Sequence, residues 1–181
     1  MNHLESIAAI IAVFGIVFTI LENRICWLVN IVASILYFKV FLDSGLPGQM
    51  LLQVLYILVG VFGFYSWGKQ ENYKIKQLDN MATTALIFLA VISGYLAYLI
   101  SDNLLWDDIS LTIASIIATY LTTKKYIENW IFWIIINFSS IALFISKDLQ
   151  LTAALYFAYA TLGIVGLRQW SKQLSRTETA H

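Results

Sequence analysis

The chain repeats itself, and this internal repeat constrains the fold more than any other feature. At an offset of 106 positions, 7–12 (IAAIIA) falls on 113–118 (IASIIA), Glu22-Asn23 on Glu128-Asn129, Trp27 on Trp133 and Ser34 on Ser140. At an offset of 103, Tyr56 falls on Tyr159, Gly60 on Gly163, Gly63 on Gly166, and Trp67-x-Lys69-Gln70 on Trp170-x-Lys172-Gln173. Chance does not readily place tryptophan, two glycines and a Lys-Gln pair in one register. The repeat predicts two related halves with a ligand held between them, as in many membrane transporters.

Long apolar stretches place this repeat in a membrane. Hydrophobic residues make up 60% of the 181 residues and charged residues only 12%, which is outside the range of soluble domains. A helix that crosses a bilayer needs about 20 predominantly apolar residues. The predicted spans are 5–21, 25–42, 49–67, 81–100, 107–123, 129–146 and 151–168. Little chain lies outside them, so we predict one transmembrane domain over 1–181, without a soluble catalytic or ATP-binding domain.

The order of the spans predicts how the two halves are oriented. Residues 5–68 and 107–171 each hold three spans, and 69–106 holds a polar loop and one unmatched helix, 81–100. Three spans reverse the direction of a chain, and the extra helix restores it, so both halves enter the membrane the same way. We therefore predict an all-α membrane protein with seven transmembrane helices in a 3+1+3 parallel internal repeat, followed by a tail at 172–181.

Basic residues gather on one side of this arrangement. They are Arg24, Lys69, Lys74, Lys76, Lys124, Lys125, Arg168, Lys172 and Arg176. The other side is mainly acidic, with Asp43, Asp102 and Asp148 among its residues. Because loops rich in Lys and Arg stay in the cytoplasm, we predict a cytoplasmic C-terminus and an N-terminus outside.

No Asp, Glu, His, Lys or Arg lies near the middle of a predicted span. Proton-coupled carriers usually place a titratable group there, and sodium sites need carboxylates or broken helices. The sequence therefore favours a passive carrier or channel. A membrane enzyme would need a nucleophile, paired carboxylates or a metal cluster, so we predict no enzyme, no catalytic residue, no metal and no cofactor. A non-transporting sensor subunit remains an alternative.

Neutral polar and aromatic side chains occupy the predicted spans instead of charges. They are Asn30, Ser34, Tyr37, Gln53, Tyr56, Thr119, Tyr120, Asn137, Ser139, Ser140, Tyr156 and Tyr159. Amides and hydroxyls bind hydroxylated solutes, and aromatic faces attract a cationic ring. These groups predict a pocket for a small solute with hydroxyls and a flat, positively charged ring. For Asn30 and Asn137, a hydrogen bond to a neighbouring helix is the alternative.

Four tryptophans lie near predicted helix ends and have two interpretations. Trp67 and Trp170 have the position of interfacial anchors. Trp27 and Trp133 lie about one turn further in, where anchoring competes with a role as gates. At the same level, Glu22 is expected to cap a helix or to pair with Arg24 or Lys125.

Several of these motifs resemble the PnuC family of bacterial vitamin transporters. The resemblance rests on the patterns Glu22-Asn23-x-x-x-Trp27-x-x-Asn30, Gln53-x-x-Tyr56-x-x-x-Gly60-x-x-Gly63-Phe64-Tyr65-Ser66-Trp67, and Lys125-Tyr126-Ile127-Glu128-Asn129-Trp130 with Asn137. It implies a SWEET-like fold in the inner membrane and facilitated diffusion of nicotinamide riboside, which a cytoplasmic kinase traps by phosphorylation. The expected partners are therefore the vitamin, that kinase and membrane lipid, without nucleic acid; a homo-oligomer stays open. The predicted substrate-binding residues are Asn30, Gln53, Tyr56, Phe64, Trp67, Asn137, Tyr156 and Tyr159.

One departure from the family pattern affects the expected substrate. Nicotinamide riboside carriers are expected to show Trp-x-x-Trp at the end of the third helix, where this chain reads Phe64-x-x-Trp67, and Gly60 stands where some relatives carry Asn. Phenylalanine keeps a stacking face but lacks the indole donor. Thiamin is therefore the alternative to nicotinamide riboside, and related members carry riboflavin.

Overall fold

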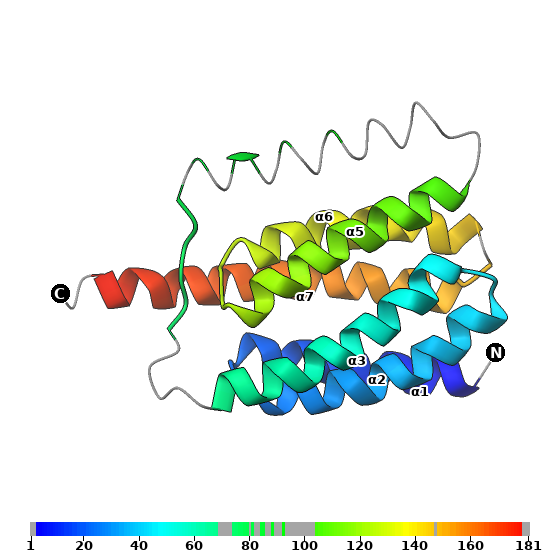
Figure 1. The fold of residues 1–181 in the computed structure, drawn as a ribbon, viewed down its shortest axis with the longest axis horizontal. Coiled ribbons are helices and arrows are strands. Elements are labelled where there is room, and N and C mark those ends of the chain that lie inside the picture. The colour runs from blue at the N-terminus through cyan, green and yellow to red at the C-terminus, as the bar shows by residue number, and fades with distance from the viewer. Residues whose placement is uncertain are drawn as a thin grey trace.

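The computed structural model describes residues 3–68, 74–79, 81, 84–85, 88, 92, 104–146 and 148–178. This part of the chain holds the long helices labelled in Figure 1, which are α1 (His3–Ile20), α2 (Ile25–Asp43), α3 (Pro47–Gly68), α5 (Leu104–Thr123), α6 (Asn129–Ser146) and α7 (Gln150–Glu178). Residues 81, 84–85, 88 and 92 are helical. The predicted linker helix 81–100 otherwise lies outside the described residues.

The helix ends lie within three residues of the predicted spans except at the end of α7. Pro47 is the first residue of α3 instead of a loop residue, because proline's fixed φ and missing N–H suit the first helical position. Just before it, Gly45 ends α2 at φ 67°, a left-handed conformation that glycine adopts without strain. α7 continues to Glu178 instead of ending at 168, because the residues after 168 include good helix formers and no glycine or proline.

The helices form two bundles that run in the same directions. Figure 1 shows α1, α3, α5 and α7 pointing towards the end that holds the C-terminus, and α2 and α6 pointing the opposite way. α2 packs between α1 and α3, and α6 packs against both α5 and α7. The two bundles meet where α3 contacts α5 and where α1 contacts α7. The seam between the bundles therefore lies along α1 and α3 on one side and along α5 and α7 on the other.

Local geometry in the first bundle recurs in the second at a constant offset of 103. Glu22 and Lys125 both have positive φ, at 54° and 56°, in the turns that follow α1 and α5. Trp27 packs edge-on against Trp67, and Trp130 packs in the same way against Trp170. Trp27 is therefore equivalent to Trp130, and the predicted match of Trp27 with Trp133 is wrong by one helical turn. The 106 and 103 offsets differ by three residues, which is close to one helical turn. A shift of one turn keeps apolar residues on the same helical face and so produces false matches.

Glycines bring the helices of each bundle close together, as their spacing predicts. A Cβ on Gly63 would lie 2.4 Å from the Trp27 ring, and one on Gly166 would lie 2.7 Å from the Trp130 ring. A Cβ on Gly60 would lie 2.6 Å from Ile31 Cγ1, and one on Gly163 would lie 2.9 Å from Ile134 Cγ1. The absence of a side chain at these positions therefore lets the helices pack closely.

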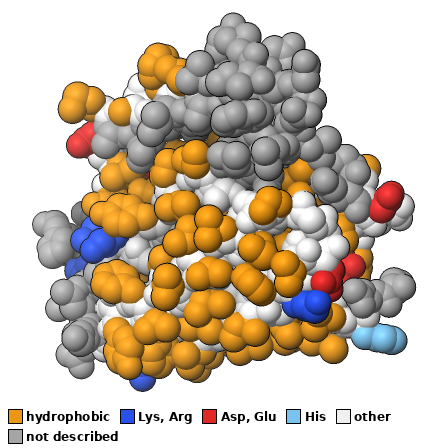
Figure 2. All heavy atoms as spheres, turned by 45° about the vertical axis from the view of Figure 1, so that its right-hand side comes forward, with side chains coloured by type: hydrophobic (Ala, Val, Ile, Leu, Met, Phe, Trp, Pro, Cys, Tyr) orange, Lys and Arg blue, Asp and Glu red, His pale blue; other side chains and the backbone are white. Residues whose placement is uncertain are grey.

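The outer surface is that of a membrane protein. Among the described residues, α1, α2, α3 and α7 are long and apolar enough to span a bilayer, and α5 and α6 contain shorter apolar stretches, Leu111–Thr123 and Asn129–Ile145. Figure 2 shows hydrophobic side chains over the middle of one face, with charged side chains towards its two sides. Exposed Ile10, Phe14, Leu58, Phe62 and Phe157 contribute to this apolar surface.

Candidate functional site

A cavity of about 180 Å³ lies between the two bundles. All six described long helices contribute to its wall, and α2 lines it along almost its whole length, from Trp27 to Phe41. The lining residues are Ala12, Ile16, Thr19, Trp27, Asn30, Ala33, Ser34, Tyr37, Phe41, Gln53, Tyr56, Thr119, Thr122, Asn129, Trp130, Trp133, Asn137, Tyr156, Tyr159 and Gly163. No charged side chain is among them.

The two halves of the cavity differ in chemistry although their backbones are related. At the 103 offset, Asn30 corresponds to Trp133 and Gln53 to Tyr156. The first bundle therefore presents amides where the second presents aromatic rings. Tyr56 and Tyr159 are equivalent to each other and both line the cavity. At the first two pairs of positions a ligand would meet an amide on one bundle and an aromatic ring on the other, while both bundles also contribute further aromatic and polar side chains to the wall.

Contacts among the rings build the aromatic side. Trp133 lies 6.2 Å from Tyr56 across the seam, measured between ring centroids, and its indole N–H donates to the Thr122 hydroxyl at 3.1 Å. Tyr156 and Tyr159 lie 5.5 Å apart one turn along α7. The ring of Trp133 is thus held by a hydrogen bond and by ring contact, which leaves little freedom at the wall.

Most of the predicted site residues line this cavity. They are Asn30, Gln53, Tyr56, Asn137, Tyr156 and Tyr159, together with the two predicted gates, Trp27 and Trp133. Gln53 and Asn137 are buried, and their burial reflects helix contact as well as the cavity. Their role in binding a substrate stays a prediction.

Phe64 and Trp67 do not line the cavity. Phe64 lies beneath the Arg24 guanidinium, 5.2 Å from it, and beside Tyr65. The residue at position 64 therefore says nothing about the cavity's cargo. The chain does contain a Trp-x-x-Trp pair, Trp130 and Trp133 on α6, and both of these rings line the cavity.

Trp67 and Trp170 are not interfacial anchors, contrary to the prediction. Both are buried, because each indole N–H donates to a main-chain carbonyl in the other bundle: Trp67 to Thr123 at 3.2 Å and Trp170 to Ile20 at 3.3 Å. Ile20 and Thr123 end α1 and α5 and are themselves equivalent at the 103 offset. The two hydrogen bonds thus cross the seam reciprocally.

An ion pair lies beside these crossed hydrogen bonds. Lys125 Nζ donates to Glu22 Oε2 at 2.7 Å, which confirms the predicted pairing of Glu22 with Lys125. The Lys125 ammonium also lies 4.7 Å from the Trp67 ring centroid. Positions 22 and 125 are equivalent, so the pair joins the same turn of the two bundles. We call Glu22, Lys125, Trp67 and Trp170 the crossed cluster.

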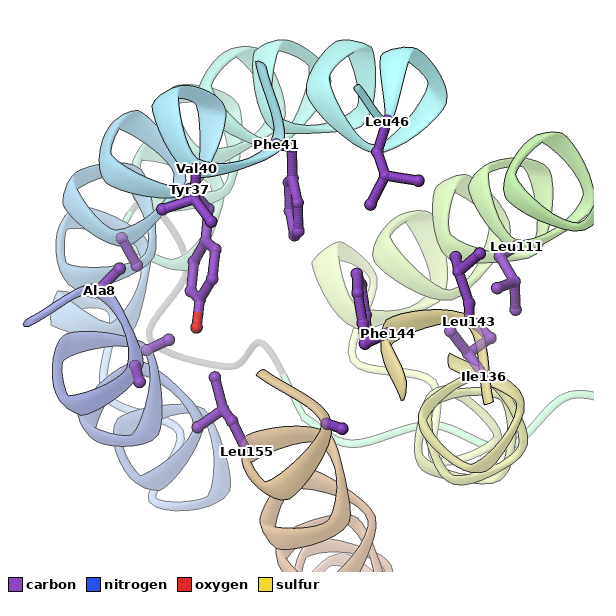
Figure 3. Packing of buried hydrophobic residues seen from close by; sticks show 14 of the residues in the cluster. Ala8, Tyr37, Val40, Phe41, Leu46, Leu111, Ile136, Leu143, Phe144 and Leu155 are labelled. Carbon is purple, nitrogen blue, oxygen red and sulfur yellow. The ribbon is translucent and has the colours of Figure 1, made fainter. Parts of the chain in front are cut away.

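The opposite end of the seam is closed by aromatic packing and a buried carboxylate. The equivalent residues Phe41 and Phe144 stack across the seam with ring centroids 5.6 Å apart, and Figure 3 shows both rings projecting into the space between the bundles. Glu5 Oε1 accepts hydrogen bonds from the Thr152 backbone N–H, at 3.1 Å, and from the Thr152 hydroxyl. This carboxylate lies at the first turn of α7, where negative charge is stabilised.

Sequence reasoning missed part of the cavity wall. Ser34, Tyr37 and Thr119 are among the polar groups that predict a pocket but not among the predicted substrate-binding residues, and Phe41, Thr122, Asn129 and Trp130 carry no prediction for the site. A signal was present, because Asn30, Ser34, Tyr37 and Phe41 have the spacing of one helical face. Among the described residues, no group of His, Cys, Asp and Glu side chains is arranged to hold a metal ion.

Comparisons with known proteins match the chain to vitamin transporters. Residues 2–172 match the family model described as nicotinamide mononucleotide transporter. The chain is 22% identical to the nicotinamide riboside transporter PnuC of Escherichia coli K12, over 94% of this chain and 85% of that protein. It is 21% identical to the riboflavin/roseoflavin transporter RibM of Streptomyces davaonensis, over 80% of this chain and 73% of that protein.

A solved structure supports the same relationship. The crystal structure of the vitamin B3 transporter PnuC superposes with a TM-score of 0.77 and 25% sequence identity, covering 96% of this chain and 82% of that one. These relatives are transporters and not enzymes. The helical bundles, the apolar surface and the cavity between the halves agree with this, and the chain belongs to the PnuC nicotinamide mononucleotide transporter family of membrane vitamin transporters.

Proposed function

We propose that this protein carries nicotinamide riboside across the bacterial inner membrane by facilitated diffusion. The observation that supports this most is that the cavity wall combines amides with aromatic rings and carries no charged side chain. Nicotinamide riboside combines a flat pyridinium ring with a hydroxylated ribose. The ring suits the side formed by Trp130, Trp133 and Tyr156, and the ribose suits the amides of Asn30 and Gln53.

The cavity favours this vitamin over the alternatives. Thiamin was considered because of Phe64, and that reason is lost since Phe64 lies outside the cavity wall. A volume of about 180 Å³ is below the ~300–1,000 Å³ typical of sites for drug-sized ligands. Such a volume suits a solute with a single aromatic ring better than the three fused rings of riboflavin. A pyridinium ring needs no buried carboxylate, because aromatic faces stabilise its charge.

The proposal includes a seven-span, SWEET-like 3+1+3 topology with parallel halves. It is supported by the common direction of the two bundles and by the helical residues within 81–92. The end that holds the crossed cluster also carries Arg24 and Lys124, whereas Glu5, Asp43 and Asp148 lie at the other end. By the positive-inside rule, the crossed cluster faces the cytoplasm and the C-terminus lies inside.

Transport then requires the two bundles to rock about the cavity. The crossed cluster joins them at one end, and Phe41, Phe144, Glu5 and Thr152 join them at the other, so the bundles are in contact at both ends in this structure. Opening the cytoplasmic end must break the ion pair and both crossed hydrogen bonds.

The closed cytoplasmic end also carries an energetic cost. Within the described part of the chain, the buried indole N–H groups of Trp27 and Trp130 have no hydrogen-bond partner. Each unpaired buried donor costs about 1–3 kcal/mol. Opening admits water to these donors and so offsets part of what the crossed cluster contributes. The closed and open states are therefore expected to be close in free energy, as a carrier requires.

A binding screen tests the proposed cargo. Trp27, Trp130 and Trp133 line the cavity, so the intrinsic fluorescence of the purified protein should change on titration with nicotinamide riboside, and not with thiamin or riboflavin. Gln53→Ala should weaken binding. Gln49→Ala is the matched control, because Gln49 is also buried on α3, one turn earlier, but does not line the cavity. Stronger binding of thiamin or riboflavin would refute the assignment.

A further inference from the structure

The wall that α1 contributes to the cavity contains a notch at Gly15. Ala12, Ile16 and Thr19 line the cavity from this helix, and Gly15 lies on the same face between them. The notch is filled by the side chain of Asn30 from α2. A Cβ on Gly15 would lie 1.8 Å from Asn30 Oδ1 and 2.9 Å from Asn30 Cγ. The amide oxygen thus occupies the place that an alanine methyl group would need.

Helix packing by itself does not require a glycine at this position. Ala118 is the equivalent residue of α5 and is fully buried, and Trp133 stands on α6 at the position that corresponds to Asn30. The backbone is alike at both places, because Thr19 donates to the Gly15 carbonyl and Thr122 to the Ala118 carbonyl, each at 2.9 Å. The difference between the two halves is therefore the side chain opposite, and Asn30 is what requires the missing Cβ.

The notch holds the Asn30 carboxamide back against α1. An added methyl group would displace the amide, since this is the end of a rotatable side chain, whereas the backbones can stay in place. The displaced amide would swing towards the cavity that Asn30 lines. Both the room for a ligand and the direction of its hydrogen bonds would change.

We propose that Gly15 is a positioning residue, which holds the Asn30 carboxamide where it binds the hydroxylated part of the cargo. This inference rests on the proposed function, because it assumes that a ribose lies on the amide side of the cavity. Gly15 acts through Asn30 and does not itself contact the ligand.

A double-mutant cycle on the purified full-length protein tests the inference, with the dissociation constant of nicotinamide riboside as the readout. Gly15→Ala should weaken binding by about fivefold to tenfold, the scale of one hydrogen bond. In an Asn30→Ala background the same change should have no further effect, because the methyl group then has room. A merely structural role for Gly15 would make the two effects additive.

Gly60→Ala is the matched control. Its methyl group would meet Ile31 Cγ1 at 2.6 Å, a comparable clash between α3 and α2, but neither residue lines the cavity. This variant should bind normally. If Gly15→Ala does not fold, the comparison of Gly15→Ala/Asn30→Ala with Asn30→Ala alone still decides: equal affinities support the inference and a weaker double variant overturns it.

Two failures can be told apart. If the wild-type protein binds nicotinamide riboside and Gly15→Ala binds it equally well, the inference about Gly15 is wrong and the proposed function stands. If the wild-type protein binds no nicotinamide riboside, the proposed function fails and this inference fails with it.

Discussion

The ion pair between Glu22 and Lys125 offers the sharpest test of the proposed rocking motion. The two side chains are 18% and 9% exposed, so water screens their attraction only weakly. Removing one partner of a buried pair costs about 3–5 kcal/mol, because the other charge stays buried and unpaired. Lys125→Gln also removes the cation–π contact with Trp67, which is worth about 0.5–2 kcal/mol. In the open state water solvates both groups, so these interactions are made only in the closed state. Their removal therefore destabilises the closed state alone.

Cys26 reports this opening directly. It is the only cysteine of the chain, it is fully buried, and it lies in the first turn of α2 beside Trp27. A membrane-impermeant maleimide should label it slowly in the wild-type protein. In Lys125→Gln the labelling rate should rise by about tenfold or more. A tenfold rise corresponds to only about 1.4 kcal/mol, which is less than the stabilisation of the closed state that this variant loses. Cys26→Ser measures the background.

The related backbones of the two turns allow a rescue. In the double variant Glu22→Lys/Lys125→Glu, the pair is reversed at two positions with the same left-handed conformation, and the lysine at 22 takes the place equivalent to Lys125, near Trp170. Labelling should return towards the wild-type rate. Lys39→Gln is the matched control, because its pair with Asp43 is exposed and lies within one helix. Equal labelling rates of Lys125→Gln and wild type, or no recovery in the reversed variant, would refute the claim that this ion pair holds the two bundles together.

Three further predictions follow from the cavity and the crossed hydrogen bonds. Trp67→Phe and Trp170→Phe should each lower the stability in detergent by about 1–3 kcal/mol, because each removes a buried hydrogen bond between the bundles, and thermal denaturation should show losses of similar size. Asn137→Ala should weaken the binding of nicotinamide riboside by about 1–3 kcal/mol without loss of folding, as calorimetric titration would show. Phe64→Trp should leave the affinities for nicotinamide riboside and thiamin unchanged, and a shift in either would place position 64 in the pocket.

The sequence was sufficient to predict the helices and much of the cavity wall. Most helix ends could be predicted because apolar runs stop at charged residues and at Gly45, whereas Pro47 begins α3 instead of standing in the loop before it. Asn30 and Gln53 could be predicted to line the cavity because polar groups inside a membrane are costly unless they are used. These inferences depend only on local composition and helical periodicity.

Features that depend on contact between distant segments could not be predicted. Trp67 and Trp170 look like interfacial anchors in sequence, and only the seam shows that each donates to a carbonyl of the other bundle. The offset of 106 was misleading because a shift of one turn preserves the apolar face. Gly15 carried no signal, since the side chain that fills its notch comes from another helix.

The claim that this protein is a passive carrier of nicotinamide riboside is tested most directly by uptake into proteoliposomes that contain only the purified protein. Among the lining residues no side chain is charged, so neither a proton nor a sodium ion has an evident coupling site there. Radiolabelled nicotinamide riboside should enter until the internal and external concentrations are equal. An imposed proton or sodium gradient should leave that plateau unchanged. Accumulation above the external concentration, or uptake no faster than into liposomes without protein, would contradict this account.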